Sequence, residues 1–221
     1  MTNLTLHLDP IEGRTFFVGD LHGAYDALIA ALTAVGFDES TDRVISVGDL
    51  IDRGPHSIKC LRLLKEPWFY AVKGNHEDMM IRGLLGDDRF VACWFQNGGD
   101  WYNELSEAEY LEFKNDLAPR VAKLPYIIRV GDVAVVHAEV IKSHIDQVSL
   151  KDTKSMIWGR TRVQNTNRDL VEGVSHVVVG HTPVRLPVTI GNHVYIDTGA
   201  CFPSGSLTLI QDTQLEAVEK A

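Results

Sequence analysis

The stretch "FYAVKGNHE" (residues 69–77) changes character half-way along. Its apolar run, residues 69–72, is typical of a buried strand and ends at a Lys-Gly pair. Asn75 and His76 follow at once, although neither residue type favours a protein core. The pattern predicts a strand, then a turn that either starts a helix or holds a reactive group, then a helix over residues 77–85. Glu77, in the expected first turn, would support that turn through the helix dipole.

The order of strand and helix repeats in the first 85 residues. Short apolar runs predict strands at 15–18, 44–47 and 68–72, and helical spacing predicts helices at 22–35, 57–65 and 77–85. A βαβαβα order predicts a largely parallel sheet with right-handed crossovers.

The rest of the chain has a different pattern. Residues 87 to about 122 have helical composition, and we interpret them as a helical insertion at one edge of the fold. Short β-branched runs follow, punctuated by glycine and proline, and they predict a second, mixed sheet: 126–130, 133–136, 176–180, 194–197 and 207–210. We see no repeat and no linker, so we expect residues 1–221 to form a single domain.

Composition restricts the protein class. The 221 residues are 45% hydrophobic and 23% charged, and no apolar run approaches the roughly 18–20 residues that cross a bilayer. The first ten residues lack the basic start and apolar core of a secretory signal, so we expect a cytoplasmic protein with no membrane partner. Cys60, Cys93 and Cys201 show neither zinc nor disulfide spacing, which favours reduced thiols. A net charge of -9 argues against a nucleic-acid partner, but not against a phosphate ligand.

Five apolar strands are each followed by aspartate, asparagine or histidine, and in four of the five a glycine stands just before the polar residue. Ligands of open α/β sheets collect outside the carboxyl ends of strands, and glycine there permits tight turns close to a ligand. The pattern predicts that six side chains converge: Asp20, His22, Asp49, Asn75, His137 and His181.

Such a set of carboxylates, an amide oxygen and imidazoles suits manganese, iron or zinc better than calcium. Six ligands suit two ions about 3.5–4 Å apart that share a carboxylate. Asp49 follows the central strand of the first three, so it is the best candidate for the shared ligand. Taken singly, each aspartate could cap a helix and each histidine could be an ordinary core residue. We interpret the remaining histidines as structural: His7, His56, His144, His176 and His193.

Five motifs resemble those of the calcineurin-like metallophosphoesterases. They are "GDLHG" (19–23), "GDLIDRG" (48–54), "GNHE" (74–77), "VVHAE" (135–139) and "GHTP" (180–183). Five further stretches are similar to the branch that includes the phosphoprotein phosphatase of bacteriophage lambda and its bacterial relatives: "ISVGDLIDRG" (45–54), "NGGDW" (97–101), "MIWGR" (156–160), "YIDTGA" (195–200) and "LTLIQ" (207–211). The resemblance runs almost end to end.

The resemblance implies a four-layer α-β-β-α sandwich with a dinuclear metal site between its loops. It places one ion on Asp20, His22 and Asp49, and the other on Asp49, Asn75, His137 and His181, with Asn75 also against the substrate phosphate. A hydroxide bridging the two ions would attack phosphorus directly, without a covalent intermediate. We expect two divalent ions, manganese in preference to iron, zinc, nickel or cobalt.

Other residues would act on the phosphate ester itself. His76 beside the site suits a general acid, and the resemblance implies that Asp52 orients it. Without the resemblance, Asp52 could equally be a loop carboxylate paired with Arg53. By resemblance Arg53 and Arg160 hold the phosphate, although Arg160 could be a surface residue. Lys73 stands where relatives carry arginine, and we expect it to bind phosphate more weakly.

Three functions remain open at this point. The first is a serine/threonine protein phosphatase, with phosphotyrosine, phosphohistidine and small phosphomonoesters as further substrates. The second is a symmetrical diadenosine tetraphosphate hydrolase. The third is a metal-binding module without catalysis, against which the presence of Asp52, Asn75 and His76 argues.

Overall fold

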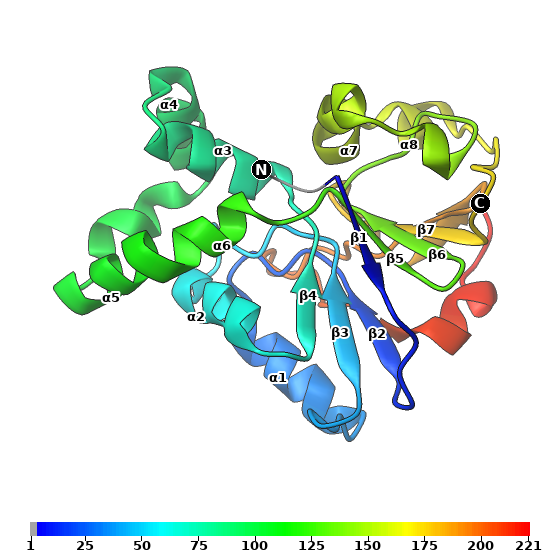
Figure 1. The fold of residues 1–221 in the computed structure, drawn as a ribbon, viewed down its shortest axis with the longest axis horizontal. Coiled ribbons are helices and arrows are strands. Elements are labelled where there is room, and N and C mark those ends of the chain that lie inside the picture. The colour runs from blue at the N-terminus through cyan, green and yellow to red at the C-terminus, as the bar shows by residue number, and fades with distance from the viewer. Residues whose placement is uncertain (1–3) are drawn as a thin grey trace.

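A computed structural model describes residues 4–221, and residues 1–3, the start of the stretch examined for a signal peptide, lie outside the described part. Two β-sheets pack face to face and helices cover their outer faces (Figure 1). This is the expected four-layer α-β-β-α sandwich.

The first sheet has the strand order β10-β2-β3-β4. Strands β2 (Thr15–Val18), β3 (Arg43–Ser46) and β4 (Phe69–Ala71) run parallel, as the βαβαβα order predicts. Strand β10 (Leu209–Gln211) joins them antiparallel to β2. The expectation that this last run belongs to the second sheet is therefore wrong, because the pattern of a strand does not name its partner.

The second sheet has the order β1-β5-β6-β7-β9-β8 and mixes parallel with antiparallel pairs. Its strands are β1 (Thr5–Leu8), β5 (Ile127–Val130), β6 (Val133–Val136), β7 (His176–Val179), β8 (Val188–Ile190) and β9 (His193–Tyr195). Strands β1 and β8 are missing from the sequence prediction. The first mixes polar and apolar residues and the second has three residues, so neither gives a strong apolar run.

The helices divide between the two outer faces (Figure 1). Helices α1 (Tyr25–Ala34) and α2 (Ser57–Arg62) lie on the side of the first sheet, and α7 (Thr153–Trp158) and α8 (Thr161–Asn165) on the side of the second. Between the sheets, the core is made largely of branched aliphatic side chains with Phe17: Ile45, Val47, Val72, Val135, Val178 and Val194.

Helix α3 (Asn75–Leu84) begins two residues before the expected start at Glu77. Gly74 caps it in an extended conformation, and the Glu77 carboxylate accepts the backbone N–H of Gly74 at 2.8 Å. The bond runs one way, because glycine has no side chain to return it, and it satisfies a free N–H group at the start of the helix. Asn75 and His76 therefore project from a helix start, not from a loop.

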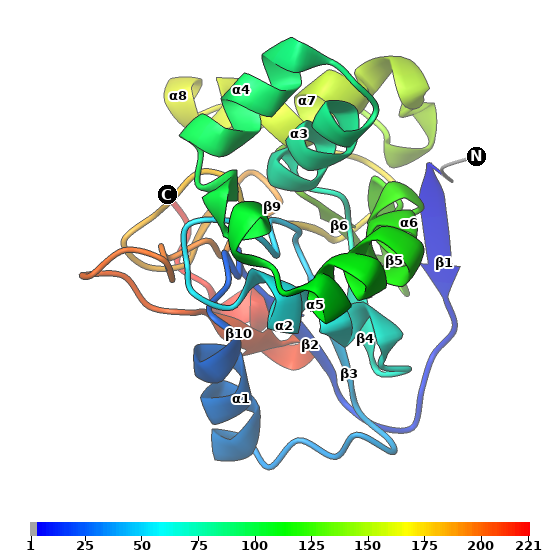
Figure 2. The same ribbon diagram turned by 90° about the vertical axis from the view of Figure 1, so that its left-hand side faces the viewer.

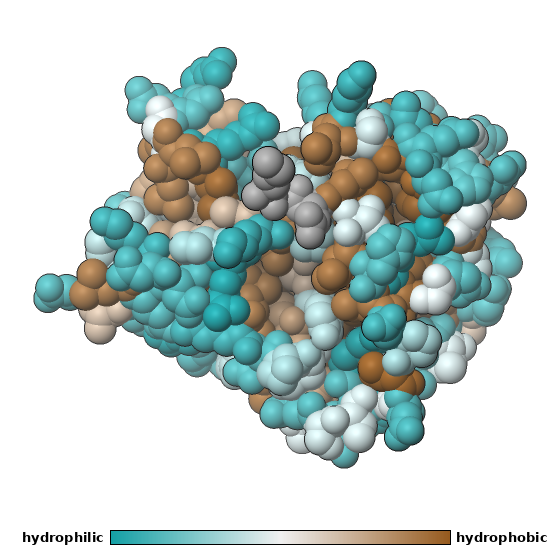
Figure 3. Space-filling model, in the orientation of Figure 1, coloured by the Kyte–Doolittle hydropathy of each residue, from teal (hydrophilic) through white to brown (hydrophobic). Residues whose placement is uncertain are grey.

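The insertion is a set of short helices beside β4 and α3, seen face on in Figure 2. It comprises α4 (Asp88–Gln96), a 3-10 helix (Gly99–Glu104), α5 (Glu107–Glu112), a π-helical turn (Phe113–Leu117) and α6 (Ala118–Ala122). Hydrophobic surface shows in the hollow between the insertion and the sandwich, where Leu6, Phe69 and Leu124 contribute (Figure 3).

Two further expectations from composition concern membranes and cysteines. Among residues 4–221, every helix is too short or too polar to cross a bilayer. Cys60, Cys93 and Cys201 are free thiols, as their spacing predicts.

A charge cluster joins the insertion to α2 and gives a pH-dependent prediction. Arg62 and Lys65 each contact Glu112 at 2.7 Å, and these bonds lower the pKa of Glu112 to about 2. Because the folded-state pKa lies below the unfolded one, the bonds stabilise the fold above about pH 4.5, and that contribution falls as the pH drops toward 2. The side chains are partly exposed, so Glu112→Gln should lower the free energy of unfolding by at most about 1 kcal/mol at pH 7. Urea titrations should show this difference shrinking at about pH 3, and a constant difference would contradict the role of the charge.

Candidate metal centre

The structure brings the six predicted side chains together at the carboxyl ends of the strands. Asp20 and His22 follow β2, Asp49 follows β3, and Asn75 begins the helix after β4. His137 and His181 follow β6 and β7, so the two sheets contribute to one cluster. All six are buried: Asp20, His22, Asp49, Asn75, His137 and His181.

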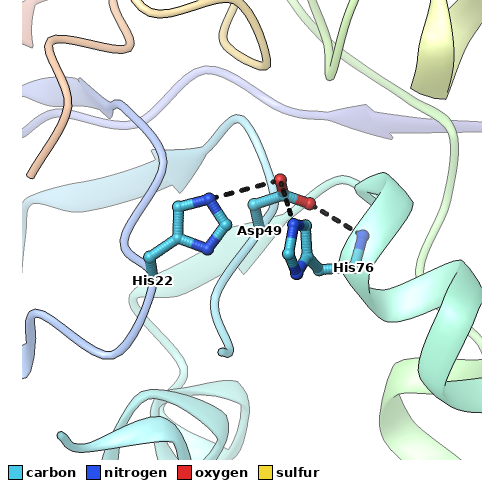
Figure 4. A group of neighbouring side chains, drawn as sticks. All are labelled: His22, Asp49 and His76. Carbon is cyan, nitrogen blue, oxygen red and sulfur yellow. Dashed lines mark hydrogen bonds and ion pairs between the residues drawn. The ribbon is translucent and has the colours of Figure 1, made fainter. Parts of the chain in front are cut away.

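Asp49 lies at the centre of the cluster. Its Oδ2 is 3.6 Å from Nε2 of His22, 3.9 Å from Nε2 of His76 and 3.5 Å from Nε2 of His137. Its Oδ1 accepts the backbone N–H of His76 at 3.0 Å, and Figure 4 shows the carboxylate between His22 and His76. Asp49 therefore belongs to both groups of side chains that could hold a metal ion: His22, Asp49 and His76, and Asp49, His137 and His181.

Asn75 completes the second group. Its Oδ1 is 2.9 Å from Nε2 of His137 and 2.8 Å from Nδ1 of His181, and these two ring nitrogens are 3.2 Å apart. The four predicted ligands of the second ion thus converge in this structure.

Asp20 lies against the His181 turn. Both carboxylate oxygens are 3.1 Å from the backbone N–H of His181. Burial, then the Asp197 and Asp49 carboxylates, raise the pKa of Asp20 well above its usual value. A Cβ at Gly180 would overlap Oδ1 of Asp20, which explains the glycine before His181.

The hydrogen bonds of two histidines show that the donor set fits a divalent cation. Nδ1 of His22 is 2.8 Å from the Ile51 carbonyl, and Nδ1 of His137 is 2.7 Å from the Val47 carbonyl. A carbonyl only accepts, so each Nδ1 carries the proton and each Nε2 turns a lone pair toward Asp49. Burial lowers the pKa of both rings, for His22 to about 3. At His137, where Oδ1 of Asn75 also lies 2.9 Å from Nε2, these lone pairs repel one another unless a cation lies among them.

Backbone strain concentrates in the same place. Among residues 4–221, six non-glycine residues have positive φ, and Thr166 is the one outside the site. The left-handed region costs roughly 1–2 kcal/mol for such residues, so the surrounding packing must hold them there. The five at the site are His22, Asp49, Asp52, Arg53 and His181.

His76 and Asp52 form a buried pair. Nδ1 of His76 lies 2.6 Å from Oδ2 of Asp52, while its Nε2 faces Asp49 and Arg53. Burial lowers the pKa of His76, but Asp49 and then Asp52 outweigh it, and the net pKa is raised. The imidazole is therefore held in one direction and its pKa is raised, which suits a general acid.

The two predicted arginines lie at the cluster. Arg53 places Nη1 2.7 Å from Nε2 of His22 and Nη2 3.0 Å from Nε2 of His76. Arg160 donates from Nε to Nε2 of His181 at 3.1 Å and from Nη2 to the His181 carbonyl at 3.2 Å. Two guanidinium groups beside one cluster can together donate hydrogen bonds to an oxyanion.

Lys73 does not join them. Its side chain is buried, and Nζ donates to the Ala122 carbonyl at 3.1 Å and lies 5.3 Å from the centre of the Tyr126 ring. These contacts tie β4 to the end of the insertion, so we remove Lys73 from the expected phosphate-binding set. The sequence places it next to the site, but its side chain points to the end of the insertion.

Glu77 supports the site more directly than the helix dipole suggests. Its carboxylate accepts the backbone N–H groups of Asp49 at 2.9 Å, Leu50 at 2.8 Å and Gly74 at 2.8 Å. One buried side chain therefore ties the turn after β3 to the turn after β4. Burial raises the pKa of Glu77 to about 7.

Asp197 is a residue that sequence reasoning missed. It follows β9, is buried, and accepts the backbone N–H of Gly199 at 2.9 Å. Burial, with a smaller contribution from the Asp49 carboxylate, raises the pKa of Asp197 to about 6. The signal was present in "YIDTGA", where an aspartate follows an apolar strand as at the other strand ends.

Comparison with known proteins identifies the family. A model of the calcineurin-like phosphoesterase family matches residues 13–207. The chain belongs to this family. Calcineurin-like phosphoesterases are dinuclear metal enzymes, in agreement with two clustered groups that share Asp49.

Relatives within the family are named for two different activities. The chain is 39% identical over 200 residues to serine/threonine-protein phosphatase 1 of Salmonella typhimurium, covering 89% of this chain and 90% of the relative. It is 33% identical over 224 residues to an asymmetrical bis(5'-nucleosyl)-tetraphosphatase of Halalkalibacterium halodurans, covering 91% of each. The protein is therefore a metallophosphoesterase, and its relatives imply a phosphorylated substrate.

Solved structures agree with the fold. A protein described as a candidate diadenosine tetraphosphatase matches with a TM-score of 0.67 at 22% identity, over 95% of this chain and 98% of that one. A serine/threonine phosphatase from Saccharomyces cerevisiae matches with a TM-score of 0.60 at 16% identity, over 95% and 84%. These similarities bear on the fold alone.

Proposed function

We propose that this metallophosphoesterase is a protein phosphatase that hydrolyses phosphoserine and phosphothreonine esters, with phosphotyrosine and phosphohistidine as further substrates. The observation that carries the proposal is the buried His76–Asp52 pair beside two arginines at one metal-binding cluster. Protein substrates are supported by the relative named as a serine/threonine phosphatase.

We propose the following ligands for the two ions. One is held by Asp20, His22 and Asp49, and the other by Asp49, Asn75, His137 and His181. Mixed oxygen and nitrogen donors favour manganese, with iron, zinc, nickel or cobalt as alternatives. When bound, divalent cations lower the pKa of a coordinated water and offset the charge of a phosphate.

The chain's own residues supply the remaining chemistry. Arg53 and Arg160 bind the phosphoryl oxygens by charge-assisted hydrogen bonds. The amide nitrogen of Asn75 is a further donor, since its oxygen faces the histidines. The departing serine or threonine oxygen needs a proton, which His76 donates from Nε2 while Asp52 holds Nδ1–H.

A second candidate is hydrolysis of dinucleoside tetraphosphates. It is supported by a relative named for this activity that is 33% identical over 91% of the chain. Its name specifies asymmetrical cleavage, whereas the alternative expected from the sequence is symmetrical cleavage. The products distinguish the two: ATP and AMP from asymmetrical cleavage of diadenosine tetraphosphate, and two ADP from symmetrical cleavage.

Turnover by metal-stripped protein, with and without Mn²⁺, tests these functions, measured as phosphate release from the esters and as nucleotide products from diadenosine tetraphosphate. Substrates would be a phosphoserine peptide, p-nitrophenyl phosphate and diadenosine tetraphosphate at equal concentration. We expect Mn²⁺-dependent turnover with the peptide preferred. A higher kcat/KM on diadenosine tetraphosphate would favour the second candidate, and turnover in excess chelator would exclude both.

We further propose that residues 1–221 act as one catalytic domain in the cytoplasm, on phosphoproteins and small phosphomonoesters and without a nucleic-acid or membrane partner. The free cysteines suit a reducing compartment, and the net charge of -9 disfavours polyanions.

A further inference from the structure

Two tryptophans of the insertion bind the carboxylate that holds His76. Nε1 of Trp94 donates to Oδ1 of Asp52 at 2.9 Å, and Nε1 of Trp101 donates to the same oxygen at 2.7 Å. The other oxygen, Oδ2, faces Nδ1 of His76 at 2.6 Å. Both carboxylate oxygens are thus occupied, and the side chain of Asp52 is fully buried.

Aromatic packing within the insertion fixes the positions of these two indole rings. The Trp94 and Trp101 rings pack edge to face, with centroids 6.0 Å apart, and Trp101 packs on Phe113 at 5.8 Å. Aromatic pairs of this kind fix ring orientation. The direction of each N–H is therefore set by the aromatic core of the insertion.

The "NGGDW" motif brings the indoles and the catalytic loop into contact. Gly98 has a φ of +100°, and a Cβ there would lie 2.6 Å from the backbone nitrogen of Arg53. A Cβ on Gly99 would lie 2.6 Å from Nε1 of Trp94, the atom that donates to Asp52. Both glycines permit a close approach that a side chain would prevent.

We propose that Trp94 and Trp101 are positioning residues for the proton donor. They fix the plane of the Asp52 carboxylate, and Asp52 in turn fixes the imidazole of His76. The insertion thereby takes part in protonating the leaving group without touching the substrate. This role rests on the proposed function, in which His76 is the general acid.

The test removes the N–H and keeps an aromatic ring. Trp94→Phe, Trp101→Phe and the double variant would be assayed, loaded with Mn²⁺, on aryl phosphates whose leaving groups range from phenol to 2,4-dinitrophenol. Each single variant loses one hydrogen bond to a charged group, so its kcat on phenyl phosphate should fall about tenfold. On 2,4-dinitrophenyl phosphate, whose leaving group needs no proton, kcat should change less than about twofold. KM should stay the same throughout.

Trp68→Phe is the matched control. Trp68 is also buried in an aromatic cluster, with Phe37 and Phe69, but within the described chain its Nε1 has no hydrogen-bond partner. Replacing this tryptophan by phenylalanine should not change how kcat depends on the leaving group. Equal losses on all leaving groups in the Trp94 and Trp101 variants, or no loss, would overturn the positioning role.

A spectroscopic readout separates this role from the activity itself. The chain has four tryptophans, so metal-free protein should give four indole N–H signals, assigned by the single variants. Asp52→Asn removes the charge at a position with φ of +73°, which asparagine tolerates. The Trp94 and Trp101 signals should shift together and the Trp68 signal should not. If neither the Trp94 nor the Trp101 signal shifts, the indoles do not hold Asp52. If both signals shift but the parent protein hydrolyses no phosphomonoester, the proposed function is wrong and the contact with Asp52 stands.

Discussion

Asp49→Asn should lose both metal ions, with affinity falling at least about 100-fold and activity falling with it. Changes to residues that only hydrogen-bond to a metal ligand already lower metal affinity about 10–100-fold, and this change removes the one charged ligand shared by both groups. Asparagine preserves the geometry: it tolerates the φ of +49° and its oxygen can still accept the His76 backbone N–H. Metal content after dialysis and calorimetric Mn²⁺ titration would measure the loss.

Asp88→Asn is the matched control for this experiment. Asp88 is exposed in the first turn of α4, so the same loss of charge should leave metal content unchanged. Two ions bound by Asp49→Asn with parental affinity would show that Asp49 does not bridge the site.

His76→Asn should keep both ions and lose about 10²–10⁴-fold in kcat on a phosphoserine peptide, the usual contribution of a positioned general acid. The side chain stands in the first turn of α3, where asparagine is tolerated, so the loss should reflect chemistry and not folding. Single-turnover kinetics would measure the chemical step, and parallel metal analysis would show whether the variant still folds and binds its ions.

His56→Asn provides the comparison, because His56 is partly exposed and its ring pairs with Asp26 at 3.1 Å, not with a residue of the cluster. It should retain parental turnover. Parental turnover by His76→Asn would instead remove His76 from the mechanism, and loss of metal would make it a ligand.

The sequence patterns predicted two sheets and the side chains that lie together, and the resemblance to the metallophosphoesterases predicted the four-layer sandwich. Residues that end apolar strands must emerge at a sheet edge, so Asp20, Asp49 and His181 could be placed together before any coordinates. The same argument would have found Asp197, had it been applied to the strand before "DTGA". These inferences succeed because the end of an apolar strand is a local property of the sequence.

Only the tertiary structure decided which strand β10 joins, where Lys73 points and what holds Asp52. Trp94 and Trp101 stand 42 and 49 residues from Asp52 in the chain, inside a segment whose composition predicts helices and nothing more. Strand partners, side-chain directions and hydrogen bonds between distant segments depend on how whole layers pack. Local periodicity carries no information about that packing, because many sequences with the same pattern can bring different residues into contact.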